Sequence, residues 1–140
     1  MQDRTLPYKR KAHVLFVGSG EVCRALIATH FANSIGAAWM EARAVALDES
    51  SKPNCAITEY DIPDQPLQRL DSKNIAWADL IVTLDESADL ACPPLPASVQ
   101  KRCYPVPQPE KTDDLRRVRD AIQQRVEGMI GGMRMMNRCT

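Results

Sequence analysis

Short apolar runs alternate with amphipathic stretches along the chain, and this pattern predicts strands that alternate with helices. Residues 13–17 are a continuous apolar run that ends at Gly18, which is typical of a buried strand. From Cys23 the apolar positions take helical spacing. Further strands are predicted near residues 41–45 and 79–83. A strand–helix alternation of this kind favours a parallel sheet with helices on both faces.

The remaining central segments carry less regular patterns. They predict short helices at residues 54–60 and 85–91 and a fourth strand at 103–106. Prolines make the segment 62–66 irregular and stiffen a loop at 105–109. Residues 67–78 are ambiguous between helix and strand.

The last helix has the clearest pattern. Thr112 is a suitable N-cap, and one apolar stripe follows it. That stripe consists of Leu115, Val118, Ile122, Val126 and Met129. Because glycine is a poor helix former, we expect Gly131 and Gly132 to end the helix. The resulting division is an N-terminal extension (1–12), one domain (13–130) and a methionine-rich tail (131–140).

Composition excludes several classes of protein. The 140 residues suit one domain, and 18 basic against 18 acidic residues give zero formal charge, so nothing steers the chain toward nucleic acid or a membrane. No apolar run approaches the length of a membrane span or a signal peptide, which predicts a cytoplasmic protein. The five cysteines are widely spaced and only two histidines accompany them, so we expect no metal and no cofactor.

The loop after the first strand is the candidate binding site. In a parallel sheet, ligands bind beyond the carboxyl ends of the strands, and loop amides that lead into a helix can hold an anion. Arg24 opposes the helix dipole there, which suggests a functional role, although an arginine that reaches solvent is an equal alternative. The predicted anion-binding loop consists of Ser19, Gly20, Glu21, Val22, Cys23 and Arg24.

Three segments together resemble low-molecular-weight protein tyrosine phosphatases and the related thioredoxin-coupled arsenate reductases. Residues 14–25 (VLFVGSGEVCRA) resemble the family signature, an apolar strand followed by Cys-x-Gly-Asn-x-Cys-Arg-Ser. Residues 77–85 resemble the third strand and its turn, and 104–109 with the last helix resemble the acid loop and closing helix. The resemblance covers about 13–130 and implies an α/β three-layer sandwich with a four-stranded parallel sheet flanked by helices.

The resemblance also shows which catalytic parts differ. The family's nucleophilic cysteine corresponds to Gly18, and its general acid, an aspartate, corresponds to Gln108. Glycine has no nucleophile and an amide is not a general acid near neutral pH. The loop asparagine corresponds to Glu21 and the supporting serine to Ala25. A carboxylate such as Glu21 disfavours a bound dianion, so pairing of Glu21 with Arg24 and residual anion binding by Arg24 are equal alternatives. We therefore expect no intact catalytic residue.

Other side chains offer little replacement chemistry. The resemblance makes Cys23 the family's second loop cysteine and places Cys92 in the region of resolving cysteines. Without a first cysteine, the thiol relay has no start. Ser19 has no adjacent histidine to activate it. We expect Cys23 and Cys92 to be buried free thiols.

Three functional hypotheses follow. The first is a pseudophosphatase that acts by binding a phosphoprotein, another protein partner or a small oxyanion, as a monomer or weak homodimer. The second is a weakly active or atypical protein tyrosine phosphatase. The third is a nucleotide-binding domain, suggested by Gly18-x-Gly20 after a strand and by Glu41 at the distance of a ribose ligand.

Overall fold

The computed structural model describes residues 11–18, 23–47, 67–104 and 112–139, with the side chains of 116–133 in the last range. The predicted helix at 54–60, the irregular segment at 62–66 and the proline loop at 105–109 lie outside these residues. So do Ser19, Gly20, Glu21, Val22 and Gln108, whose predicted roles stay predictions.

Five parallel strands form one sheet in the order β3-β2-β1-β4-β5. The α/β fold class is confirmed, but the expected number of strands, four, is wrong. The strands are β1 (Ala12–Gly18), β2 (Met40–Ala46), β3 (Leu67–Arg69), β4 (Leu80–Thr83) and β5 (Gln100–Cys103).

The two edge strands account for the differences from the sequence prediction. The ambiguous stretch 67–78 splits into β3 and the helix α2 (Ser72–Trp77). Strand β5 starts three residues before the predicted 103–106. Both edges are short and largely exposed, so neither carries the apolar run that marks the buried strands β1 and β4.

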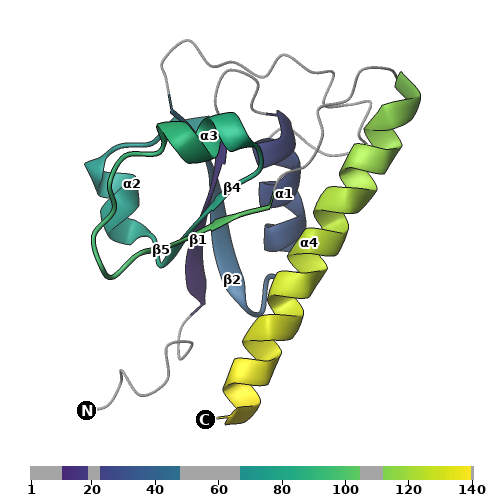
Figure 1. The fold of residues 1–140 in the computed structure, drawn as a ribbon. Helices are drawn as coiled ribbons and strands as arrows, with labels where there is room; N and C mark the ends of the chain where they lie inside the picture. Colours follow the sequence, from purple (N-terminus) through teal and green to yellow (C-terminus); the bar gives the residue numbers. More distant parts are fainter. Residues whose placement is uncertain (1–10, 19–22, 48–66, 105–111, 140) are drawn as a thin grey trace.

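Helices cover both faces of the sheet, which confirms the three-layer architecture (Figure 1). The helices α1 (Cys23–Ser34) and α4 (Thr112–Cys139) pack on one face, and α2 and α3 (Glu86–Ala91) on the other. Strand β1 serves both cores, because alternate side chains of a strand point to opposite faces. Val14 and Phe16 lie in the core under α1 and α4, whereas Leu15 and Val17 lie in the core under α2 and α3.

Helix α4 confirms four positions of the predicted stripe but not the predicted end, and the Leu115 side chain lies outside the described residues. Val118, Ile122, Val126 and Met129 are buried. The helix continues through Gly131 and Gly132 to Cys139, so the boundary drawn at residue 130 falls inside it. Each glycine costs about 1 kcal/mol in a helix. Met133, which is only 6% exposed, offsets part of that cost by extending the buried stripe one further turn.

The strand order reverses direction between β1 and β4. From β1 the chain moves to β2 and β3 on one side, and later to β4 and β5 on the other. The carboxyl ends of the two central strands therefore lie side by side, with Val17 opposite Thr83. A crevice at such a reversal is the usual ligand site of open parallel sheets. Among the described residues, no helix has the length and apolarity needed to span a membrane.

Candidate functional site

Gly18 closes the central strand at the reversal. It pairs with Ala46 in the β1–β2 register, and its carbonyl accepts a hydrogen bond from the Leu47 amide at 3.0 Å. These contacts hold the backbone at the carboxyl edge of the sheet, where the resemblance places a nucleophile. The position has a fixed backbone and no side chain to react.

Arg24 is the second residue of α1 and does not reach solvent. Its side chain is 9% exposed, and its Nη2 lies 3.2 Å from Oδ2 of Asp85. The exposed-arginine alternative is therefore wrong. Asp85 is thus one carboxylate partner of the guanidinium, and the pairing with Glu21 that the sequence suggested lies outside the described residues.

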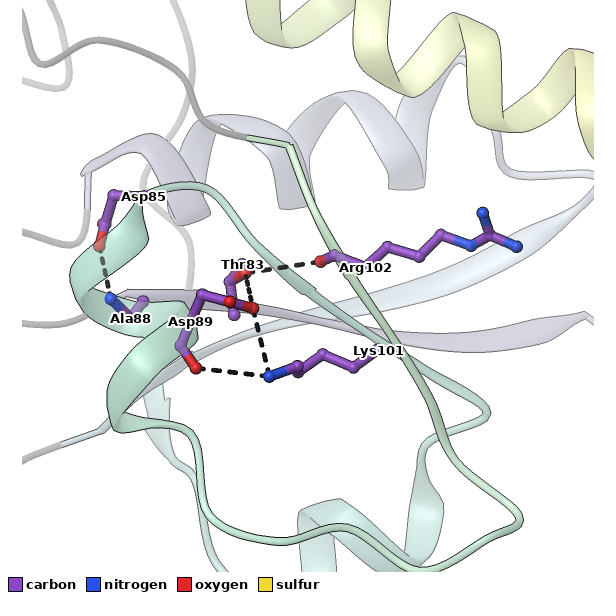
Figure 2. A network of polar contacts seen from close by, with 6 residues as sticks. All are labelled: Thr83, Asp85, Ala88, Asp89, Lys101 and Arg102. Carbon is purple, nitrogen blue, oxygen red and sulfur yellow. Dashed lines mark hydrogen bonds and ion pairs between the residues drawn. The ribbon is translucent and has the colours of Figure 1, made fainter.

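Asp85 uses its two carboxylate oxygens for different purposes. It is the N-cap of α3, and its Oδ1 accepts a hydrogen bond from the Ala88 amide at 2.6 Å (Figure 2). Its Oδ2 is the oxygen that meets Arg24. One carboxylate thus joins the start of α3 to the start of α1 across the carboxyl edge of β1 and β4.

A second polar cluster fixes the position of α3. Thr83, at the end of β4, is fully buried and its hydroxyl donates to Oδ1 of Asp89 at 3.2 Å. Lys101 of β5 lies 3.3 Å from the same oxygen (Figure 2). These contacts tie the middle of α3 to two strands. The helix, and Asp85 at its start, therefore has a defined position over the sheet.

Asp85 is the site residue that the sequence analysis did not identify. It ends the segment 77–85 that carries the family resemblance, and an aspartate before a short helix signals an N-cap. That signal concerns only the local helix. The contact with Arg24 spans 61 positions along the chain, and no local pattern reports it.

Cys23 differs from the expected free thiol. It is 1% exposed and disulfide-bonded, so the prediction of a buried thiol is wrong in its oxidation state. Pairing of distant cysteines depends on the distance between their α-carbons in the fold, which spacing in the sequence does not give. The first helical position therefore carries no free nucleophile in this structure.

Cys92 is a free, half-buried thiol at the C-cap of α3. Burial raises the pKa of this thiol, the Lys101 ammonium lowers it and the Asp89 carboxylate raises it, with a net rise. A thiol reacts as its thiolate, so the environment makes Cys92 less reactive than an ordinary cysteine. It has no feature of an activated nucleophile.

The described part of the chain offers no metal site, because it contains no group of three histidine, cysteine or acidic side chains placed to hold an ion. A groove of about 600 Å³ lies between β5 and the second half of α4, lined in part by Leu80, Arg102, Tyr104 and Met129. It includes neither Gly18 nor Arg24. Gly18 and Arg24, which the sequence assigned to the candidate site, thus lie at the reversal between β1 and β4 and not in this groove.

The structure does not support Glu41 as the ribose ligand in the third hypothesis, a nucleotide-binding domain. Glu41 lies opposite His13 near the amino end of the sheet, whereas Gly18 lies opposite Ala46 at the carboxyl end. A ribose ligand would have to lie beside the glycine loop. The placement of Glu41 as a nucleotide ligand is therefore wrong.

Curated proteins named arsenate reductases match most of the chain. An arsenate reductase of Brevibacillus brevis is 32% identical over 126 residues, which cover 85% of this chain and 94% of the relative. Arsenate reductase 2 of Staphylococcus saprophyticus is 29% identical over 124 residues, which cover 84% and 95%. No family model matches the chain.

Solved structures show the same fold. An arsenate reductase in its reduced state superimposes with a TM-score of 0.67 at 22% identity, covering 87% of this chain and 98% of the other. A low-molecular-weight phosphotyrosine phosphatase of Vibrio cholerae gives a TM-score of 0.70 at 16% identity, covering 88% and 97%. The Brevibacillus relative shows that the chain belongs to the arsenate reductase family, and the solved structures show that its fold is also that of low-molecular-weight protein tyrosine phosphatases.

Proposed function

We propose that this chain is a member of the family that has lost the transfer chemistry and acts by binding. The observation that carries the proposal is Gly18 at the carboxyl end of β1. Phosphoryl transfer through a covalent intermediate and reduction of arsenate by a first cysteine both need a nucleophile at this point. A glycine cannot supply one.

The surrounding groups support the same conclusion. Cys23 is engaged in a disulfide, and the Cys92 thiol has a raised pKa because burial disfavours its thiolate. Arg24, the side chain that would hold an oxyanion, is paired with Asp85. The general-acid position is Gln108 in the sequence, and an amide does not deliver a proton to a leaving group.

The bound partner remains a proposal drawn from the site's position. A phosphoprotein, another protein or a small oxyanion would each meet the carboxyl edge of β1 and β4, where the family's substrates bind. The cytoplasmic location and the monomeric or weakly dimeric state likewise stay predictions from the sequence.

A second candidate is a thiol-dependent reductase, and two observations favour it. The curated relatives are named arsenate reductases, and Cys23 takes part in a disulfide. Reduction of arsenate to arsenite takes two electrons, which two thiols supply when they form one disulfide. In this candidate Cys23 and its disulfide partner would be the dithiol, regenerated by a reduced thioredoxin.

Turnover by the purified protein separates these candidates. We expect wild type to show neither arsenate-dependent oxidation of reduced thioredoxin nor aryl-phosphate hydrolysis. The matched variants are Gly18→Cys with Gln108→Asp, which restores both family positions, and Cys23→Ala. Arsenate reduction by wild type that Cys23→Ala abolishes would establish the reductase and refute the binding role. Hydrolysis by wild type would support the atypical phosphatase.

A further inference from the structure

The groove between β5 and the second half of α4 has two ends that differ in charge. Its volume of about 600 Å³ lies in the range of small-molecule sites. Because Leu80 pairs with Gln100, Asp79 lies before the start of the paired strands β4 and β5, and Tyr104 lies after their end. Asp79 gives one end a carboxylate, which accepts a hydrogen bond from the His13 amide at 2.8 Å. The Tyr104 end has the opposite charge.

Two arginines supply that positive charge. Arg102 lines the groove and shares a strand face with Tyr104, and Figure 2 shows its side chain extended away from the polar contacts of α3. The guanidinium carbon of Arg125 on α4 lies 5.4 Å from the centroid of the Tyr104 ring. The neighbouring positions are uncharged: Val82 pairs with Arg102 in the sheet, and residues 121, 122, 128 and 129 lie one turn from Arg125. Within the described residues, neither guanidinium therefore has a carboxylate partner.

Between its charged ends the groove has an apolar floor and an open helix side. Leu80, Met129 and Met133 line this part, and methionine side chains adapt to irregular apolar shapes. Gly128 and Gly132 line the α4 side, where an added β-carbon meets no described atom within 4 Å outside the adjoining helix backbone. A ligand can therefore approach the backbone of α4 closely.

We infer that this groove binds an amphipathic carboxylate, whose head contacts Arg102 and Arg125 and whose apolar body lies along α4. A guanidinium binds a carboxylate through charge-assisted hydrogen bonds, and the carboxylate of Asp79 repels the reverse orientation. A second copy of the chain fits less well, because a two-fold contact uses the same patch of both copies and would bring their arginines together. This second site goes beyond the binding role proposed for the reversal and does not depend on it.

The test is a titration of the isotope-labelled 140-residue protein with octanoate, followed by the NMR shifts of the Arg102, Gly128 and Gly132 amides. We expect saturable shifts at these amides. Octanol has the same apolar body without the charge, and it should bind roughly 10-fold more weakly than octanoate. Acetate has the head without the body, and it should bind roughly 100-fold more weakly.

Matched variants locate the ligand within the groove. Gly132→Leu places a side chain in the groove and should abolish octanoate binding, whereas Gly131→Leu makes the same change at a glycine that does not line it and should match wild type. Leucine is a better helix former than glycine, so both variants favour the folded helix. Arg102→Gln and Arg125→Gln should each weaken octanoate binding roughly fivefold and leave octanol binding unchanged. Arg116→Gln, which changes an exposed arginine on the opposite side of α4 from Arg125, should have no effect.

Three results would overturn the inference. The absence of a saturable shift at the groove amides up to about 10 mM octanoate shows that the groove is not a site for such a ligand. Equal binding of octanol, or an equal loss in Arg116→Gln, shows that the two arginines do not recognise the head. A wild-type dimer in sedimentation that Gly132→Leu alone converts to a monomer shows that a second copy occupies the groove. All these readouts measure binding or assembly at the groove, so the proposed function of the reversal site fails or stands separately.

Discussion

Two short helices on the same face of the sheet begin in the same way but lie in different electrostatic surroundings. Asp71 caps α2 and Asp85 caps α3, each by accepting a hydrogen bond from an amide three positions later. At α3 the nearby arginine, Arg24, contacts the capping carboxylate itself. At α2 the nearby arginine, Arg43, donates to the neutral Asn74 side chain and stacks over the Trp77 ring at 3.9 Å.

The difference separates a cap that acts only within its own helix from a cap that also forms an ion pair with another helix. Both aspartates satisfy a helix N-terminus, which is a local task. Only at the reversal between β1 and β4 does the described structure bring the cap against the arginine that the family resemblance assigns to oxyanions. The same local sequence feature thus gains a long-range contact where the topology places it beside α1.

The largest difference in stability between the two helix starts should come from removing the arginine beside each. Arg24→Ala leaves a mostly buried carboxylate without its guanidinium, and we expect it to lower the free energy of unfolding by about 3 kcal/mol. Arg43→Ala removes one hydrogen bond and one cation–π contact, for a loss of about 1 kcal/mol. Urea unfolding of both variants measures the difference. Equal losses would mean that the ion pair at α3 is no stronger than the neutral contact at α2.

Truncating the caps should give a smaller difference in the same direction. Asp71→Ala loses only a cap, about 1 kcal/mol, whereas Asp85→Ala also leaves Arg24 without this carboxylate, for about 2 kcal/mol in total. The double variant Arg24→Ala/Asp85→Ala completes a thermodynamic cycle. We expect a coupling of about 1–2 kcal/mol between the two residues. Additive losses in the cycle would argue against a direct interaction.

The sequence predicted the parts of the fold that depend on local patterns. The apolar run of β1, the start of α1 and the stripe of α4 follow from the spacing of residues such as Phe16 and Ile122, which are buried as expected. The end of α4 did not follow, because tertiary burial of Met133, which offsets part of the local cost of the two glycines, is not visible in the local sequence.

The candidate site was predictable only in its location. The loop after the first strand and Gly18 follow from motif and topology. Asp85 and the oxidised Cys23 did not, because both depend on contacts between segments far apart in the chain. An aspartate that only caps a helix and one that also pairs with a distant arginine have the same local sequence signal.

The anchoring of α3 should contribute less than its capping. Thr83→Val keeps the shape of a fully buried side chain but removes the donor to Asp89, and we expect a loss of about 1 kcal/mol. Lys101→Gln removes the ion pair on the same carboxylate. Because the Lys101 side chain is 38% exposed, that loss should be only about 0.3 kcal/mol. Urea unfolding distinguishes them, and the reverse order would show that the ion pair, not the buried hydroxyl, positions α3.

The smallest effect concerns the thiol at the far end of the same helix. Burial raises the pKa of Cys92, and the Lys101 ammonium partly offsets this rise. The thiolate of Cys92 therefore forms at a higher pH than the thiolate of an ordinary cysteine. The rate of Cys92 alkylation by iodoacetamide, followed by peptide mass spectrometry, should increase roughly 10-fold per pH unit between about pH 7 and 8. Lys101→Gln should slow the reaction about twofold by removing the favourable charge, whereas Lys101→Arg should preserve the wild-type rate.

An alkylation rate that does not change between about pH 7 and 8 would mean that Cys92 is already a thiolate. An activated cysteine would then lie at the opposite end of α3 from Asp85, and the reductase candidate would gain a nucleophile that the structure does not indicate.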